Sequence, residues 1–420
     1  MPKRKRGRKR PPSIPEPRED QRVQPYCIHF DHCGGCTLQH FSYPGQLELK
    51  QGAAVHAFQR ELLTDLPEPL DILPALQERG YRNKLEYTFS RRRWLTPEEI
   101  AGGEEFIHRD GAGFHVRGFF DRVLDLQECH HQPEPSNRLR LFVRDTAREL
   151  GISFYDISAN EGDLRTLMVR TTQSGQVMAV VMFGSDNPEQ REALLSRVVA
   201  QFPELSSLYY IVNTTRNSSP IGHEQILYAG SPTITETCGT LQLAIHPASF
   251  FQTNTGQAER LYSLVADWAA LDGNQVVYDL YSGIGSIGLF LASAAQKIIG
   301  IEVIEDAVHG ARENASLNGI ANADFHCGEA EKLCTPEFFA SHGAPDLIIL
   351  DPPRPGLHKN LIATLREITA PRILYVSCNP STQADDLEQL ADLYRVVRRQ
   401  AVDMFPQTLH VENVVELALR

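Results

Sequence analysis

The second half of the chain alternates short apolar runs with longer amphipathic stretches. Strands joined by helices in this order are typical of βαβ units, so we expect a mostly parallel, doubly wound sheet of Rossmann-like class. The predicted strands lie at 276–280, 297–303, 323–327, 346–351 and 372–378, and the predicted helices at 256–271, 305–318, 359–369 and 382–393. This α/β domain is predicted over 246–420.

The pattern before residue 246 is of another kind. Short β-rich runs separated by glycine and turn residues occupy 80–130 and 164–245, with an Arg-rich helix predicted over 138–150. Residues 25–245 are therefore predicted to form a β-rich α+β region, so the fold class changes near residue 246.

Composition and charge exclude several classes of protein. The 420 residues are 42% hydrophobic and 22% charged, which is ordinary for globular domains and unlike collagen or a disordered chain. No apolar run approaches the roughly 18–20 residues that cross a bilayer, so we expect no membrane partner. The net charge of −12 argues against nucleic acid as a partner, but residues 1–24 hold nine Lys or Arg and three Asp or Glu.

We interpret residues 1–24 as a flexible basic tail that binds RNA; a solubility tail or a nuclear signal is the alternative. The tail lacks the apolar stretch of a secretory signal, and eight cysteines are too few for a disulfide scaffold. We therefore expect a cytoplasmic protein with reduced cysteines, acting as a monomer.

A glycine-rich loop follows the strand predicted at 276–280. It reads Gly-x-Gly-x-x-Gly from Gly283 to Gly288, and Glu302 closes the next strand 19 residues after Gly283. The glycines allow close backbone approach to a ligand, and an acid at this spacing can bind ribose hydroxyls. NAD and S-adenosylmethionine fit this pattern equally well.

Two further strands end in reactive or charged residues. Asp351 follows one strand, and Cys378 follows another. Because ligands of doubly wound sheets bind beyond the carboxyl ends of the strands, these residues are expected to meet Tyr281 and Glu302 in one crevice. A thiol with its ordinary pKa near 8.5 is only slightly ionised at pH 7, so we expect local activation of Cys378.

Six segments in the α/β domain resemble the RNA uracil-5 methyltransferase family, in that family's order: SFFQTN, DLYSGIGSIG, IEVIEDA, LDPPRPG, YVSCNPST and HVENVVEL. The resemblance implies methylation of uridine C5 with S-adenosyl-L-methionine. It assigns Cys378 as the nucleophile and Glu412 as the base; an exposed edge residue is the alternative for Glu412. The positions implied to contact the cofactor are Gln252, Tyr281, Glu302 and Asp351. Ser286 departs from the asparagine of several members.

The chemistry requires such a pair of residues. Uracil C5 is a poor nucleophile, and addition of the Cys378 thiolate to C6 converts C4–C5 into an enolate that attacks a sulfonium methyl group. A base, expected to be Glu412, then removes the C5 proton so that the cysteine can leave. The target uridine has to leave its stack, which is least costly in a loop or bulge.

Three cysteines lie close together in the sequence at Cys27, Cys33 and Cys36, with Cys129 as the expected fourth ligand. The spacing suits zinc or an iron–sulfur cluster. CIHFDHCGGCTLQH resembles the cluster-bearing branch of the same family, which implies a [4Fe–4S] cluster on these four residues and 23S rRNA as substrate. By the same resemblance, residues 46–78 are expected to pack on the catalytic domain, and no TRAM-type barrel precedes the cysteines.

A basic strip at 79–94 contains six Arg or Lys, interleaved with Tyr81, Tyr87, Phe89 and Trp94. Arginines can neutralise phosphates and aromatic rings can stack on bases, so the strip is predicted to contact RNA; a strand with a solvated basic face is the alternative. Other functions remain open: a tRNA uracil-5 methyltransferase, a cytosine-5 methyltransferase, a NAD-dependent iron–sulfur oxidoreductase, or a metal-bearing RNA-binding module.

Overall fold

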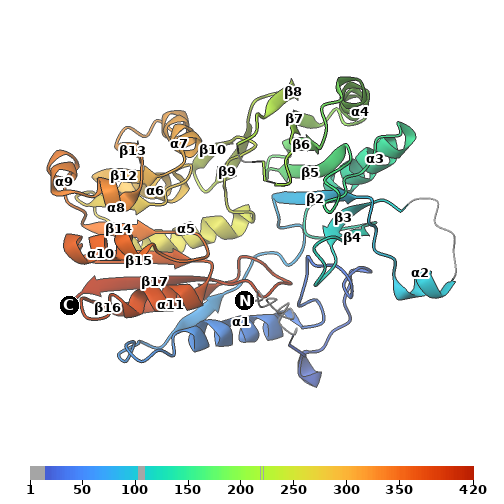
Figure 1. Cartoon of the computed structure of the whole chain (residues 1–420). Helices are drawn as coiled ribbons and strands as arrows, with labels where there is room; N and C mark the ends of the chain where they lie inside the picture. The colour runs from blue at the N-terminus through green and yellow to red at the C-terminus, as the bar shows by residue number, and fades with distance from the viewer. Residues whose placement is uncertain (1–14, 103–108, 218, 221) are drawn as a thin grey trace, which may run out of the picture. The chain divides into compact units, whose positions relative to one another are not determined.

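The computed structural model describes residues 15–102, 109–217, 219–220 and 222–420, so most of the basic tail lies outside the described residues. The chain divides into two compact units (Figure 1). Of the described residues, those within 15–42, 85–169 and 179–230 form unit 1, and those within 43–84, 170–178 and 231–420 form unit 2. The domain limits expected from the sequence were 1–24, 25–245 and 246–420, with residues 46–78 packed on the catalytic domain; the segment 43–84 lies in unit 2.

Unit 2 is built on an eight-stranded sheet in the order β1-β16-β17-β15-β14-β11-β12-β13. The five strands from β15 to β13 are parallel, and β17 runs antiparallel between β15 and β16. The strands are β1 (Leu70–Leu73), β11 (Val276–Leu280), β12 (Lys297–Glu302), β13 (Ala323–Cys327), β14 (Leu347–Leu350), β15 (Arg372–Ser377), β16 (Tyr394–Val402) and β17 (Glu412–Leu419). The mixed α/β, Rossmann-like class predicted for this part of the chain is confirmed.

The helices of unit 2 begin and end where local sequence signals favour it. Asn254 caps α5 by accepting a hydrogen bond from the backbone N–H of Gln257, and Asn379 caps α11 in the same way. These helices are α1 (Tyr43–Ala57), α5 (Thr255–Ala269), α6 (Ser286–Leu291), α7 (Glu305–Leu317), α8 (Ala330–Leu333), α9 (Pro336–His342), α10 (Lys359–Ile368) and α11 (Pro380–Glu388). A two-stranded ribbon of β9 (Ile234–Cys238) and β10 (Leu241–Ile245) completes the unit.

The segment 43–84 belongs to the same unit as the α/β sheet. Strand β1 extends the sheet by pairing in parallel with β16, and α1 lies against β16 and α11 (Figure 1). A buried ion pair joins α1 to the loop after β16: Lys50 Nζ lies 2.5 Å from Asp403 Oδ1, and both side chains are almost fully buried. The Tyr43 hydroxyl donates to the other oxygen of Asp403 at 2.9 Å.

Breaking this pair is expected to destabilise the protein strongly. Lys50→Met leaves the Asp403 carboxylate buried without its cation, which costs about 3–5 kcal/mol. Urea unfolding measures the loss. Lys297→Met is the matched control, because Lys297 and Asp324 form a pair of 2.9 Å that is partly exposed, for which a loss below about 1 kcal/mol is expected. Equal losses in the two variants would contradict the prediction.

Unit 1 contains a seven-stranded sheet in the order β4-β3-β2-β5-β6-β7-β8. Strands β5 and β6 are buried along their whole length. This agrees with the uninterrupted apolar run of β6, whereas β5 also buries Arg165 and Arg170. The strands are β2 (Lys84–Ser90), β3 (Gly111–His115), β4 (Val123–Asp125), β5 (Leu164–Thr171), β6 (Val177–Phe183), β7 (Leu205–Val212) and β8 (Ile226–Gly230), and the helices are α2 (Pro97–Gly102), α3 (Ser136–Glu149) and α4 (Pro188–Gln201).

The basic strip does not present its aromatic rings to solvent as the sequence suggested. Tyr87 and Phe89 are buried because alternate positions of β2 face the core. Tyr81, which precedes β2, is also buried, and its hydroxyl donates to the Pro406 carbonyl at 2.9 Å. Arg91 and Arg92 are held by the Asp156 carboxylate at 2.9 and 3.1 Å. The expectation that all four aromatic residues can stack on bases is therefore wrong for three of them.

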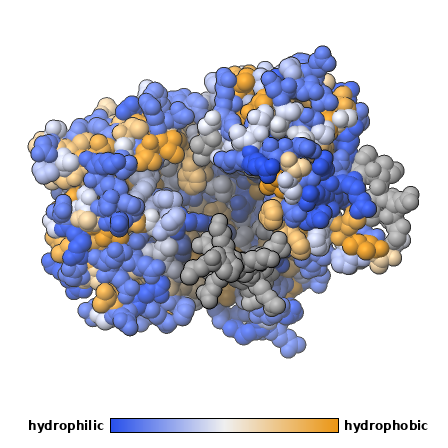
Figure 2. Space-filling view, in the orientation of Figure 1, coloured by the Kyte–Doolittle hydropathy of each residue, from blue (hydrophilic) through white to orange (hydrophobic). Residues whose placement is uncertain are grey.

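On the face drawn in Figure 2, hydrophobic residues form separate patches among mostly hydrophilic ones. Within the described residues, no helix combines the length and the apolar character needed to span a bilayer.

Candidate functional site

The strand register of unit 2 places several predicted site residues in one row. Leu280 is paired with Ile301 on β12 and with Leu350 on β14. The residues that follow, Tyr281, Glu302 and Asp351, consequently lie next to one another at the carboxyl ends of three adjacent strands.

A second pairing brings the cysteine and the last acid together. Ser377 at the end of β15 pairs with Asn413 of β17 in antiparallel register. Cys378 follows Ser377 and Glu412 precedes Asn413, so the two residues face each other across this pair of strands. The electrostatic interaction of Glu412 with the Cys378 thiol agrees with this placement. Residues about 34 positions apart in the sequence thus meet at one edge.

The glycine loop between β11 and α6 is shaped for close approach of a ligand. Gly283 and Gly285 both have positive φ, and a Cβ on Gly285 would come within 2.8 Å of the Phe325 ring. Gly283 has no atom within 4 Å of the place where a Cβ would be. The Glu302 carboxylate accepts hydrogen bonds from the backbone N–H groups of Gly283 at 3.1 Å and Val303 at 2.8 Å. The loop and the acid therefore form one ordered cradle.

The Gln252 side chain is buried in the segment that leads into α5. Its backbone carbonyl accepts a hydrogen bond from Asn83 Nδ2 at 2.9 Å, and Asn254 Nδ2 donates to the Met404 carbonyl at 3.0 Å. The segment is thereby tied to the loop that leads into Glu412. The Ser286 hydroxyl lies 3.1 Å from the Tyr262 hydroxyl.

Burial raises the pKa of the Cys378 thiol, and the nearby Glu412 and Asp351 carboxyls raise it further. Arg354 opposes these effects through its charge and a hydrogen bond. The expected activation of the thiol is therefore wrong for this state of the protein, because desolvation outweighs the single arginine. Ionisation of Cys378 would need a change in its surroundings, such as the loss of a negative charge nearby.

Arg354 is a site residue that the sequence interpretation left without a role, although it stands in the LDPPRPG segment. Its guanidinium also donates to the His410 ring, at 3.0 Å to Nδ1. The loop that carries it is held by Asp386, which accepts hydrogen bonds from the Leu357 N–H at 2.8 Å and the Tyr375 hydroxyl at 2.7 Å. The signal that could have identified Arg354 is its position three residues after Asp351, the acid at the end of the strand.

Two acids of the site have pKa values far above those of exposed carboxyls, so that at pH 7 Glu412 is mostly protonated and Asp351 is only partly ionised. Burial raises the pKa of Glu412 to about 8, and the neighbouring Asp351 adds to the effect. Burial likewise raises the pKa of Asp351 to about 7. Within the described residues, Glu412 Oε2 is buried without a hydrogen-bond partner. An unsatisfied buried oxygen at the base of a reactive site is available to a ligand.

The raised pKa of Glu412 predicts a pH-dependent effect on stability. The folded protein keeps a proton that the unfolded chain releases near pH 4.5, so this contribution to stability is lost as the pH rises towards 8. Glu412→Gln is therefore expected to gain stability relative to wild type by up to ~1.4 kcal/mol per pH unit over this range. Urea unfolding at pH 5, 6.5 and 8 measures the difference; a constant difference would contradict the prediction.

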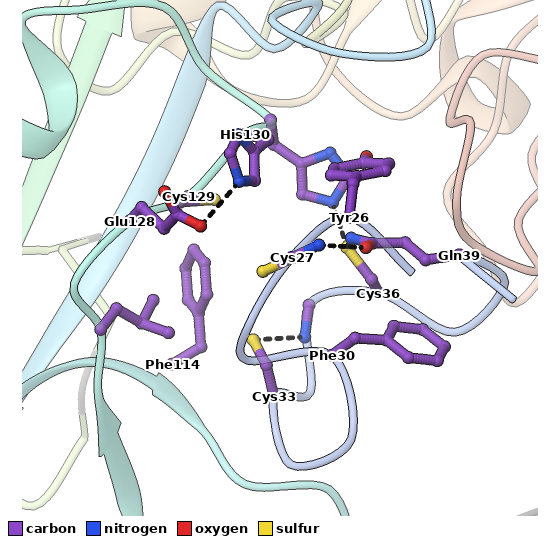
Figure 3. A pocket seen from close by; sticks show the side chains of 13 residues that line it. Tyr26, Cys27, Phe30, Cys33, Cys36, Gln39, Phe114, Glu128, Cys129 and His130 are labelled. Carbon is purple, nitrogen blue, oxygen red and sulfur yellow. Dashed lines mark hydrogen bonds and ion pairs between the residues drawn. The ribbon is translucent and has the colours of Figure 1, made fainter. Parts of the chain in front are cut away.

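The four cysteines expected to bind metal line one pocket in unit 1. Cys27, Cys33 and Cys36 come from one loop, and Cys129 comes from the segment after β4 (Figure 3). Burial, together with the charges of Cys129 and Cys27, raises the pKa of Cys33 to about 12. The Cys36 sulfur lies 2.8 Å from His131 Nε2 and accepts from Gln39 at 3.2 Å. All eight cysteines are free thiols.

The ligand geometry of the pocket is not that of a preformed zinc site. Among the described residues, no three His, Cys, Asp or Glu side chains are grouped closely enough to hold a single metal ion. Tetrahedral zinc would require the sulfurs to lie within about 4 Å of one another. The four thiols line the same pocket without the close grouping that one zinc ion needs.

Comparison with known proteins gives consistent results. Residues 240–420 match the family model described as tRNA (Uracil-5-)-methyltransferase. An uncharacterized RNA methyltransferase of Porphyromonas gingivalis is 44% identical over 403 residues, which cover 94% of this chain and 87% of the relative. One from Bacteroides thetaiotaomicron is 40% identical and covers 95% and 88%. The crystal structure of the Pyrococcus abyssi tRNA (uracil-54, C5)-methyltransferase in complex with S-adenosyl-L-homocysteine is 29% identical, with a TM-score of 0.71, and covers 92% of this chain and 86% of that one.

Proposed function

This chain belongs to the RNA (uracil-5-)-methyltransferase family, and we propose that it methylates C5 of a specific uridine through a covalent adduct between Cys378 and C6. The observation that carries the proposal is the pairing of Cys378 with Glu412 at the carboxyl end of the sheet, beside Asp351 and the glycine loop. A thiol, an acid with raised pKa and a ligand cradle at one edge are the parts that this reaction needs.

The thiolate of Cys378 adds to C6 of the uracil ring and forms the S–C6 bond. Arg354 is the cation close to this thiol, and its charge favours the ionised form. The C5–C6 double bond supplies the electron pair that passes to the C4 oxygen as an enolate. The Arg354–His410 contact holds the guanidinium in place while the adduct forms.

Glu412 completes the reaction as the base. After C5 has become methylated, a Glu412 oxygen takes the C5 proton, and the electron pair left behind expels the Cys378 thiolate. The carboxyl has to be ionised at that moment. A pKa of about 8 makes Glu412 a stronger base than an exposed glutamate, at the cost of a smaller ionised fraction at neutral pH.

The cradle around the glycine loop fits S-adenosyl-L-methionine, which supplies an electrophilic methyl group when bound. Gly283 leaves open space for the ligand, and Glu302 is oriented by its backbone hydrogen bonds with lone pairs remaining for ribose hydroxyls. Tyr281 and Asp351 lie beside it at the strand ends, and we assign Gln252 to the same site. The methyltransferase relatives favour this cofactor over NAD.

The thiol pocket fits a [4Fe–4S] cluster, which we propose is held by Cys27, Cys33, Cys36 and Cys129. Four thiols from two separate segments, in mostly apolar surroundings, are the donor set that such a cluster uses. Protein purified without oxygen should contain about four irons and four sulfides per chain. Cys129→Ser should lower the iron content, whereas Cys327→Ser, at an exposed thiol, should not. Colourless protein with bound zinc would contradict the assignment.

We propose 23S rRNA as the substrate of this cytoplasmic, monomeric enzyme, on the resemblance of the cysteine segment to the cluster-bearing branch. tRNA is a second candidate, since the Pyrococcus abyssi structure that aligns over 92% of this chain is a tRNA (uracil-54, C5)-methyltransferase. An assay that incubates the purified protein and a labelled methyl donor with either rRNA or tRNA tests both candidates. New 5-methyluridine in 23S rRNA is expected, whereas 5-methyluridine only in tRNA favours the second candidate. 5-Methylcytidine, or no transfer to either RNA, would overturn the proposal.

A further inference from the structure

The turn between β3 and β4 in unit 1 exposes two adjacent phenylalanine side chains. Phe119 is 46% exposed and Phe120 is 66% exposed. The Phe119 ring lies against Trp94, with ring centroids 5.1 Å apart. Three of the four aromatic residues of the basic strip are buried. The fourth, Trp94, is the one whose ring contacts this turn. The accessible aromatic surface of this region is therefore centred on residues 119 and 120.

Arginines flank the exposed rings. Arg117 directs its guanidinium to the backbone carbonyls of Cys33 at 3.3 Å and Cys36 at 2.6 Å, so its charge is solvated by neutral acceptors. Arg122 lies 4.0 Å from the Asp121 carboxylate, which is already paired with Arg92 at 3.2 Å. Cationic groups beside flat apolar rings are complementary to nucleotides, which offer a phosphate and a base face.

The turn is held on a fixed base. The Gly34 N–H donates to the His115 carbonyl at 3.1 Å, and the Arg117 N–H donates to the His32 carbonyl at 3.2 Å. A Cβ on Gly34 would come within 2.6 Å of the His115 oxygen, so only glycine permits this approach. The loop that carries three of the pocket cysteines thus supports the turn, and little conformational entropy is lost when the rings meet a ligand.

We propose that the turn of residues 116–122 is a docking surface for unpaired nucleotides of the RNA substrate, with Phe119 and Phe120 stacking on bases and Arg122 near a phosphate. The proposal deepens the proposed function and rests on it. Unpaired nucleotides are the occupant favoured here, because bases in a duplex do not expose their faces to aromatic side chains. Phe120 makes the larger contribution, since it is the more exposed ring.

The test measures binding of full-length protein to a single-stranded oligouridine and to an RNA duplex of equal length. Phe120→Ala and Phe119→Ala/Phe120→Ala are each compared with wild type. The double variant should bind oligouridine about 5- to 100-fold more weakly than wild type. Phe120→Trp, which keeps an aromatic ring at this position, should bind oligouridine as tightly as wild type. The slope of log affinity against log salt should stay the same for the double variant and fall by about one for Arg122→Gln.

Leu227→Ala is the control, because Leu227 is an exposed apolar residue on β8 of the same unit. Thermal unfolding checks that each variant is folded. If loss of the Phe119–Trp94 contact destabilises the double variant, the oligouridine affinity of Phe120→Ala alone tests the docking surface. Unchanged oligouridine affinity, or an equal loss for the duplex, would overturn the docking surface. Wild-type protein that binds oligouridine through the turn but transfers no methyl group would instead overturn the proposed function alone.

Discussion

Cys378→Ala is expected to abolish methylation, with a fall in kcat of about 10⁴-fold or more. Without the thiol, C5 of uracil stays a poor nucleophile, because the bond to C6 that creates the enolate is not formed. RNA binding should remain, since Cys378 lies in unit 2 and is not part of the proposed docking surface at residues 116–122 of unit 1. Methyl transfer to RNA measures the activity, and RNA containing 5-fluorouridine should trap wild-type protein but not the variant as a covalent complex.

Cys327→Ser provides the matched control for this experiment. Cys327 is also a free thiol of unit 2, but it is exposed at the end of β13. Its replacement should leave methylation and trapping unchanged. A Cys378→Ala protein with wild-type activity would show that another residue is the nucleophile. Trapping by 5-fluorocytidine in place of 5-fluorouridine would indicate a cytosine substrate.

Glu412→Gln is expected to slow turnover about 10²- to 10⁴-fold and to leave the enzyme joined to its product. Glutamine preserves the shape of the side chain but cannot take the C5 proton, so the thiolate is not expelled after methylation. A covalent RNA–protein complex should therefore accumulate with unmodified RNA. Denaturing gel electrophoresis detects it, and quantification of 5-methyluridine measures the turnover.

Two controls separate this effect from a general loss of structure. Glu305→Gln changes an exposed acid at the start of α7 and should behave as wild type. Adding Cys378→Ala to Glu412→Gln should remove the covalent complex, because no sulfur remains to form it. If the Glu412→Gln variant turned over at the wild-type rate, a group other than Glu412 would have to be the base.

Much of the α/β domain could be predicted because its signals are local. Apolar runs of strand length, capping asparagines and the glycine loop each act within a few residues, and the predicted strands at 276–280 and 323–327 match β11 and β13. Strand β16 was not predicted, since its three arginines hide the strand pattern. Arg398 is accommodated there by ion pairing with Glu416 at 2.5 Å and by packing over Trp268.

The order of the motifs also identified the candidate site residues, but their electrostatic state depends on contacts that are distant in sequence. The motif around Cys378 suggested an activated thiol. The structure surrounds that thiol with Glu412 and Asp351, whose carboxyls oppose its ionisation, and with a single opposing arginine. Likewise, the four-cysteine pattern indicated a metal site, but it is the fold of unit 1 that brings Cys129 to the loop of the other three cysteines.

The net charge of −12 shows the same division. Charge patterning along the chain located basic segments, yet in the described part of the strip at 79–94 arginines pair with acids and most rings are buried. The sequence by itself determined the α/β class and the family, and it singled out the candidate residues for the chemistry, because periodicity and ordered motifs are properties of neighbouring residues. Only the tertiary structure decided which side chains meet, which are solvated and which keep their protons, because burial and strand register join residues far apart in the chain.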